Sequence, residues 1–155
     1  MTDLYEPSSD FLRAVLAGNV RVSGDEFAAN LRKLIATTED GDRANRDWAT
    51  FLLAQQPVDT PDVRAALIKA AYDSDGAVRA EAILGLAQRD PLVALPYIQA
   101  ELSESVVYQS TLEAAELAAH PSLVDGLLGF MNSSDKEWMD KAVAAALGAC
   151  RKAHW

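Results

Sequence analysis

Two segments of this chain align with each other at an offset of 33 residues, and this internal repeat limits the fold more than any other feature. The first segment begins at Asp42 and the second at Asp75. The residues that coincide are Asp42/Asp75, Ala44/Ala77, Arg46/Arg79, Ala49/Ala82, Leu53/Leu86, Ala54/Ala87 and Gln55/Gln88. A repeat of this length is typical of solenoids, in which each short unit buries its apolar side against the next unit.

Each copy has the pattern of two helices. In the second copy, Val78, Ala82 and Leu86 recur every four residues and form one apolar stripe of a helix. Pro91 then begins the next helix at its first turn, where the missing N–H of proline costs nothing. The same junction recurs in the neighbouring copies, at Thr60-Pro61 and at His120-Pro121.

The rest of the chain completes an all-α organisation with about nine helices in one domain, residues 1–155. Ser23 and Glu26 have the spacing of a capping box at the start of a helix. Alanine and leucine dominate the composition, which favours helices over strands. The expected parts are an N-terminal helix pair at 8–40, repeats at 42–73, 75–103 and 104–133, and a C-terminal capping helix at 135–152.

A resemblance to a known family lies in the second copy, which reads Asp75-Gly-Ala-Val-Arg-Ala-Glu-Ala-Ile-Leu-Gly-Leu-Ala-Gln-Arg-Asp-Pro91. This segment is similar to bacterial HEAT-like repeats of the phycobilin-lyase type. The first copy, with Arg46-Asp-Trp-Ala-Thr-Phe51, resembles bacterial HEAT-repeat proteins of unassigned function. The resemblance covers roughly residues 40–150. It implies an α-solenoid of stacked antiparallel helix pairs.

The resemblance also implies a structural role for the charged residues of the repeat. In that family, the aspartate and the arginine of each copy are expected to bond across adjacent copies. The matching positions are Asp42, Arg46, Asp75 and Arg79. Since residues that recur in every repeat serve a structural purpose common to all copies, we interpret these four as a scaffold ladder and not as a site.

The charge of the chain bears on its partners. The formal net charge is −9, and no lysine or arginine lies between Arg89 and Lys136. Nucleic acids and anionic membranes attract basic proteins, so neither is expected as a partner. The acidic residues of that interval form either a solvated surface or a docking face for a basic protein. They are Asp90, Glu101, Glu104, Glu113, Glu116, Asp125 and Asp135.

The chain start and the cysteine content predict a cytoplasmic protein. Residues 1–6 carry acidic side chains where a signal peptide needs basic ones, and no apolar run follows. No segment approaches the roughly 20 apolar residues that span a bilayer. Cys150 is the single cysteine, so no disulfide forms within the chain.

Motifs for catalysis or cofactor binding are absent from the sequence, so we expect neither enzymatic activity nor a cofactor. The two histidines are His120 and His154, and neither has the neighbours of a catalytic histidine. His120 is expected to complement a helix C-terminus. Glu113, Glu116 and His120 share a helix face and are a weak candidate for a metal site. An exposed acidic face is the favoured interpretation of these residues.

Solenoids usually bind partners through the second helix of each pair, here expected at 61–72, 91–103 and 121–132. Trp48 aligns with the polar residue Glu81, so an outward tryptophan is a further candidate for partner binding. The positions of the second helices that lie outside the apolar stripe, and that we expect to contact a partner, are Arg64, Lys69, Gln99, Glu101 and Asp125.

The sequence therefore predicts a non-enzymatic protein–protein interaction module with an acidic surface. An adaptor, a regulatory subunit or an immunity-type inhibitor of a basic toxin would each fit. The resemblance alone implies an alternative, a lyase or chaperone for a tetrapyrrole chromophore. A structural piece of a larger assembly is a third possibility. The partner and the oligomeric state stay open.

Overall fold

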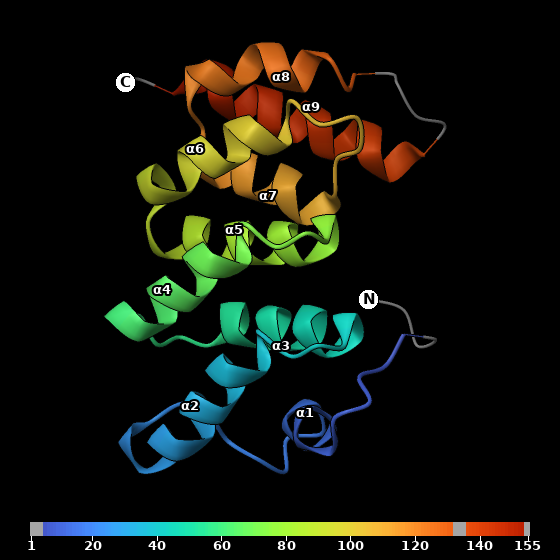
Figure 1. Cartoon of the computed structure of the whole chain (residues 1–155). Coiled ribbons are helices and arrows are strands. Elements are labelled where there is room, and N and C mark those ends of the chain that lie inside the picture. The colour runs from blue at the N-terminus through green and yellow to red at the C-terminus, as the bar shows by residue number, and fades with distance from the viewer. Residues whose placement is uncertain (1–4, 132–135, 154–155) are drawn as a thin grey trace. The chain divides into compact units, whose positions relative to one another are not determined.

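The computed structural model describes residues 5–131 and 136–153, and within these ranges the chain forms helices and turns without strands (Figure 1). The chain divides into two compact units, Met1–Gly85 and Leu86–Trp155. The division falls inside helix α5. The helices are α1 (Asp10–Leu16), η1 (Asp25–Phe27), α2 (Ala28–Thr37), α3 (Arg43–Gln55), α4 (Pro61–Ala70), α5 (Gly76–Arg89), α6 (Pro91–Glu101), α7 (Gln109–Ala118), η2 (Pro121–Leu123), α8 (Val124–Leu128) and α9 (Glu137–Lys152), where η marks a 3₁₀ helix.

The first unit is built around α3, against which α1, α2 and α4 pack. Its helix starts follow the capping chemistry of the sequence. The Asp42 carboxylate accepts a hydrogen bond from the Asn45 N–H at 3.0 Å, and the Thr60 hydroxyl accepts one from the Val63 N–H at 3.3 Å. Pro61 occupies the first turn of α4, as expected. The largest fully buried side chains are Leu12, Leu34, Leu53, Leu67 and Ile83.

Gly85 allows a close approach of helices in the first unit. A Cβ atom on this residue would lie 2.8 Å from the Ala54 Cβ and 3.2 Å from the Ala54 Cα. Protein interiors are densely packed, so this contact leaves no space for even a methyl group. The repeat places Leu52 of α3 at the position equivalent to Gly85, so the two copies differ here.

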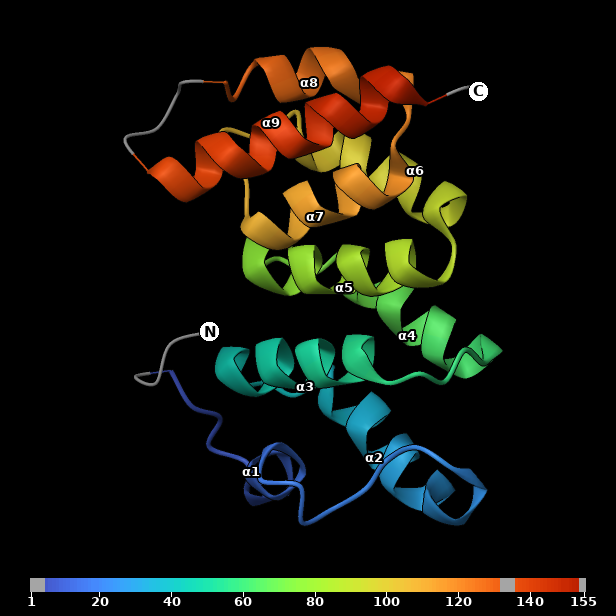
Figure 2. The ribbon, with the colours of Figure 1, turned by 180° about the vertical axis from the view of Figure 1, so that it is seen from behind.

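The second unit contains α6 to α9. Helix α7 packs against α6 and α9, and α8 packs against α9, as the view from behind shows (Figure 2). Pro91 lies in the first turn of α6, and the Asp90 side chain caps this helix by accepting from the Leu92 N–H at 3.1 Å. The largest fully buried side chains are Leu86, Ile98, Leu112, Leu123, Leu127 and Leu147.

The predicted capping box at Ser23 and Glu26 is wrong. Gly24 lies between this serine and the following helix. Its φ is 103°, a backbone conformation that residues other than glycine rarely adopt. The chain therefore turns after Ser23. Neither η1 nor α2 has a side-chain cap at its start.

Two other predicted elements differ in extent. Residues 121–132 were expected to be one helix, but the chain forms η2 and then the short helix α8, which ends at Leu128. The expected C-terminal helix begins at Glu137 in the described residues, while Asp135 lies outside them. None of the helices in the described ranges is long and apolar enough to cross a bilayer. The organisation as a single domain with the repeat bounds given above stays a prediction.

Candidate functional site

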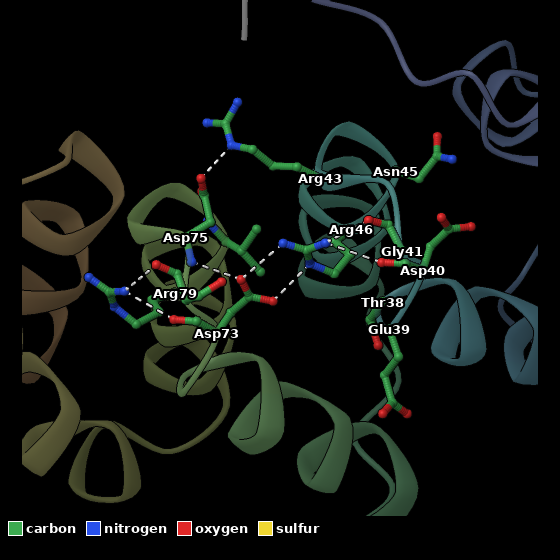
Figure 3. A network of polar contacts seen from close by, with 12 residues as sticks. Thr38, Glu39, Asp40, Gly41, Arg43, Asn45, Arg46, Asp73, Asp75 and Arg79 are labelled. Carbon is green, nitrogen blue, oxygen red and sulfur yellow. Dashed lines mark hydrogen bonds and ion pairs between the residues drawn. The ribbon is translucent and has the colours of Figure 1, made fainter.

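A network of polar contacts joins the turns before α3 and α5 in the first unit (Figure 3). The Arg46 Nη1 atom donates to the carbonyl oxygens of Asp40 at 3.2 Å and Gly41 at 3.3 Å. The same guanidinium pairs with the Asp73 carboxylate, with Nε 3.0 Å from Oδ2. Both side chains of this ion pair are largely buried, with 19% and 13% exposed. Arg46 therefore ties the turn before its own helix to the turn of the next copy.

The same turn chemistry occurs twice. The Arg79 Nη1 atom donates to the carbonyl oxygens of Asp73 at 3.0 Å and Ser74 at 3.3 Å, as Arg46 does in the first copy. The carboxylate of Asp73 also accepts from the Asp75 N–H at 2.9 Å. In the first copy, the Asp40 carboxylate accepts from the Asp42 N–H at 2.8 Å. Each copy therefore closes its turn with an aspartate and an arginine.

The ladder expected from the sequence is wrong in the residues that it pairs. Arg46 reaches the next copy through Asp73 and not through Asp75. Asp75 is paired with Arg43 and also caps α5 by accepting from the Val78 N–H at 3.2 Å. The expectation omitted Asp73 and Arg43. The offset of 33 residues also aligns Asp40 with Asp73, so the missed acceptor left a signal in the sequence.

The Asp75 carboxyl shows how this network acts on ionisation. Burial raises its pKa, but the hydrogen bond from Arg43 and the backbone N–H groups of Val78 and Ala77 outweigh burial, so the pKa is lowered. A carboxylate that accepts several hydrogen bonds is stabilised in its charged form. The hydrogen bonds of these turns therefore favour the charged form of Asp75, which agrees with a structural role.

A groove lies between α2 and α4 in the first unit. One hollow of about 280 Å³ and an adjoining one of about 310 Å³ share Glu39, Ala66 and Lys69. Lys69 and Glu39 form an ion pair that joins the two helices. The other lining residues are Thr38, Arg46, Ala70 and Asp73 in the first hollow, and Arg32, Ile35, Asp62 and Ala65 in the second. Basic and acidic side chains are mixed in this groove, so it has no clear preference for one charge.

Three of the expected contact residues bond within the chain. Arg64 forms two hydrogen bonds to Asp59, at 2.7 and 2.8 Å. Lys69 pairs with Glu39, as described above. The Gln99 side-chain amide donates to the Ser122 hydroxyl at 2.8 Å. A partner that binds these side chains has to compete with their existing contacts.

The expected surface position of Glu101 is wrong. Glu101 is only 6% exposed, and it shares the buried face of α6 with Ala94 and Ile98. Those residues are spaced as one helical stripe, and Leu92 lies outside it. Leu92 is instead 57% exposed. Asp125, another expected contact residue, is exposed on α8.

Trp48 is half-buried and held on two sides. Its indole Nε1 donates to the Tyr5 carbonyl oxygen at 2.9 Å. Its ring packs edge-on against Phe51, with 5.7 Å between the ring centroids. The polar edge and part of the ring are therefore already occupied by this chain.

The weak metal candidate does not assemble. Glu113 and Glu116 are exposed on α7, but the helix ends at Ala118 and Ala119 adopts a left-handed conformation with φ 48°. His120 therefore leaves the helix face of the two glutamates. No group of three or more histidine, cysteine or acidic residues in the described ranges is placed to hold a metal ion.

The histidine and the cysteine have structural surroundings. His120 caps η2, because its Nδ1 accepts from the Ser122 N–H at 3.1 Å, and its expected role at the C-terminus of α7 stays a prediction. Its 2.7 Å contact with the Ser122 hydroxyl belongs to this local cap. Cys150 is 1% exposed, and burial raises the pKa of its thiol, which disfavours a reactive thiolate. His154 lies outside the described residues.

Exposed carboxylates and apolar side chains lie together on the second unit. Glu113 and Glu116 share one face of α7 with Leu117, which is 49% exposed. Asp125 and Leu128 share a face of α8, where Leu128 is 41% exposed. Of the other acidic residues of the interval, Glu104 is exposed, Asp90 caps α6, and Asp135 lies outside the described residues. We call Glu113, Glu116 and Leu117 the α7 acidic face.

Comparison with known proteins agrees with this architecture. Residues 31–114 match the family described as HEAT repeats. Protein YibA from two strains of Escherichia coli is 31% identical over 111 residues, which are 72% of this chain and 39% of YibA. The X-ray structure of Escherichia coli YibA superimposes with a TM-score of 0.68 and 24% identity, covering 95% of this chain and 51% of that chain.

These matches differ in how much of each chain they cover and in what they show. The chain spans less than half the length of the YibA sequences it matches, 39%. At 24% identity, the structural likeness shows the fold alone. The repeat match covers more than half of the chain and includes α3, α4, α5 and α6. The repeated turns, the helix pairs and these matches together place the chain in the HEAT-repeat family, with the all-α solenoid fold of stacked antiparallel helix pairs.

Proposed function

We propose that this protein is a non-enzymatic binding module whose partner is a protein segment with basic and apolar side chains. HEAT repeats are helical scaffolds and interaction modules, and this family role is the starting point. The observation that carries the finer proposal is the α7 acidic face, where Glu113, Glu116 and the half-exposed Leu117 lie side by side. A cytoplasmic location is part of the same proposal.

Charge complementarity supports this partner chemistry. No lysine or arginine lies between Arg89 and Lys136, so the exposed carboxylates of this interval lack basic residues nearby in the sequence. Opposite charges speed up association and reject partners of the same sign. An exposed leucine beside the two carboxylates adds apolar area that a basic amphipathic helix would cover. A basic helix with one apolar side therefore fits this face.

Binding of a defined probe tests the proposal. The probe is a synthetic amphipathic helix of leucine and lysine, and a leucine and glutamate peptide of equal length is the control. The lysine peptide should bind. Added salt should lower its affinity, because dissolved ions screen charge–charge attraction beyond about 8–10 Å. Equal binding of both peptides would contradict a role for charge.

Charge reversal locates the surface. The variant Glu113→Lys/Glu116→Lys should lower the affinity for the lysine peptide by about tenfold or more, which corresponds to about 1.4 kcal/mol. The variant Asp25→Lys/Glu26→Lys makes the same change in net charge on η1 and should bind almost as the original protein does. Circular dichroism checks that the helical content is unchanged. If both variants lose affinity equally, the net charge of the protein determines the affinity for the peptide, and the α7 acidic face is not the binding surface.

The tetrapyrrole alternative has a separate measurement. A bilin titrated into the protein should leave its absorption band unchanged. Tight binding with a shifted band would contradict the proposal and favour a chromophore-related role.

A further inference from the structure

The N-terminal segment, residues 5–9, lies extended against α3 and is held mainly through its polar backbone groups. Trp48 donates to the Tyr5 carbonyl oxygen at 2.9 Å. The Ser9 N–H donates to the Asn45 side-chain oxygen at 3.1 Å, and the Asn45 side-chain nitrogen donates to the Ser8 hydroxyl at 3.1 Å. One tryptophan and one asparagine therefore bind both ends of the segment.

Two charged residues complete the contact with the aromatic ring of this segment. The Arg43 guanidinium lies over the Tyr5 ring, 5.6 Å from its centroid. Asp47 is 4% exposed, and its Oδ1 atom is fully buried. The Tyr5 hydroxyl is likewise buried, and burial, followed by the charge of Asp47, raises the pKa of this hydroxyl. We call Arg43, Asn45, Asp47 and Trp48 the α3 seat.

Every residue of the α3 seat departs from the repeat. At the offset of 33 residues, the second copy has Gly76, Val78, Ala80 and Glu81 at these four positions. The neighbouring residues Asp42, Ala44 and Arg46 match the second copy. Between Asp42 and Trp48, the copies thus differ only at the side chains that surround residues 5–9. A helix that only had to stack would keep the apolar Val78 and Ala80 pattern, both of which are buried in α5.

Residues 5–9 match the polar groups of the seat. With the segment in place, Asn45 is 6% exposed and both of its side-chain amide atoms have partners in Ser8 and Ser9. Without the segment these atoms would face water, so binding exchanges hydrogen bonds with water for hydrogen bonds with the segment. The contacts require an aromatic residue with a free carbonyl, followed by a serine and a backbone N–H. Pro7 lies between them and restricts the backbone to an extended form.

We propose that the α3 seat is a binding site for an extended peptide, that the chain's own residues 5–9 fill it, and that a separate segment of the same chemistry can replace them. The ligand class is an aromatic-X-Pro-Ser-Ser segment. Because the attached segment has a high effective concentration, a free peptide competes poorly until the attached one is weakened. This proposal does not depend on the function proposed for the second unit.

Fluorescence of Trp48 in the full chain tests the proposal. Trp138→Phe and Trp155→Phe leave Trp48 as the single tryptophan. In this background, Tyr5→Ala/Ser8→Ala should shift the emission to longer wavelength, because the indole loses its partner segment. Glu6→Ala is the matched control, since the Glu6 side chain is exposed in the same segment, and it should leave the emission unchanged.

Addition of a capped peptide of residues 5–10 completes the test. The peptide should reverse the shift of the Tyr5→Ala/Ser8→Ala variant and bind it about tenfold or more tightly than the chain with its own segment intact. A peptide with alanine at the tyrosine and first serine positions should have no effect. Absence of an emission shift in the variant, or absence of peptide binding at millimolar concentration, would overturn the proposal. Should the variant fail to fold, slow exchange of the Ser9 amide in the unmodified chain supports the seat, and fast exchange contradicts it.

Discussion

Helices α3 and α5 begin with the same turn but present different faces. Both have an aspartate cap, Asp42 or Asp75, and an arginine that donates to the carbonyls of its own turn. On the helix faces the copies diverge, because α3 has Asn45 where α5 has the buried Val78.

The difference separates two kinds of constraint. The turn must satisfy its own backbone groups in each copy, so its residues recur. The helix face must match whatever packs on it, and for α3 that is the polar segment of residues 5–9. Similar turns therefore indicate a repeat, while the departures from the repeat mark sites with a particular neighbour.

The largest expected effect concerns the element that the copies share. Arg46→Ala should lower the free energy of unfolding by about 3 kcal/mol, because the largely buried Asp73 carboxylate loses its partner. Urea denaturation measures this. Arg43→Ala is the control, since the Arg43 side chain is 55% exposed and its pair with Asp75 should contribute less than about 1 kcal/mol. Equal losses for both variants would show that burial does not distinguish the two pairs.

A smaller effect tests the close approach that is particular to α5. Gly85→Ala should cost about 2 kcal/mol, because the added methyl would lie 2.8 Å from the Ala54 Cβ. Gly148→Ala is the matched control, since nothing lies within 4 Å of a Cβ there, and it should be neutral or stabilising. Thermal unfolding of the two variants decides. A stable Gly85→Ala protein would mean that α3 and α5 can move apart freely.

Making α3 more like α5 gives the third prediction. Asn45→Val introduces the residue of the second copy and should cost about 1 kcal/mol, because the Ser9 N–H and the Ser8 hydroxyl lose their partner. Hydrogen exchange should become faster at Ser9 and remain slow in the middle of α3. A gain in stability would indicate that packing of the valine contributes more than the two hydrogen bonds of Asn45. It would contradict the inference that the face of α3 is adapted to residues 5–9.

The smallest effect is a pH dependence from two carboxyls with opposite shifts. Burial, followed by the charge of Asp75, raises the pKa of Asp47 above its ordinary 3.8. A folded state that holds this proton more tightly is stabilised below pH 3.8 and loses that stabilisation as the pH rises through the folded pKa. Asp47→Asn should therefore flatten this decline, by less than about 1 kcal/mol.

Asp75 has the opposite sign. Its lowered pKa stabilises the folded state above 3.8, and this contribution is lost as the pH falls through the folded pKa. Asp75→Asn should remove the part of the stability loss at acidic pH that comes from Asp75. Urea midpoints measured between about pH 3 and pH 7 would separate the two variants. Identical pH profiles for the two variants would contradict the assignment.

The candidate site was only partly predictable. The repeat pointed to Arg46 and Arg79, and it also contained the signal for Asp73, at the same offset from Asp40. Glu101 was misplaced because α6 is apolar nearly all round, so its periodicity did not show which side is buried. No pattern in the sequence indicated the contact of Tyr5 with Trp48, because it joins residues far apart in the chain.

The sequence by itself determined the local features of this protein: the repeat, the helix starts at Pro61 and Pro91, and the turns closed by aspartate and arginine. These follow from hydrogen bonds between near neighbours in the chain, so residue type and spacing suffice. Only the tertiary structure decided which side of α6 is buried, how closely Gly85 approaches Ala54, and what covers Asn45. Those outcomes depend on the packing of distant segments, which the order of residues along one helix does not contain.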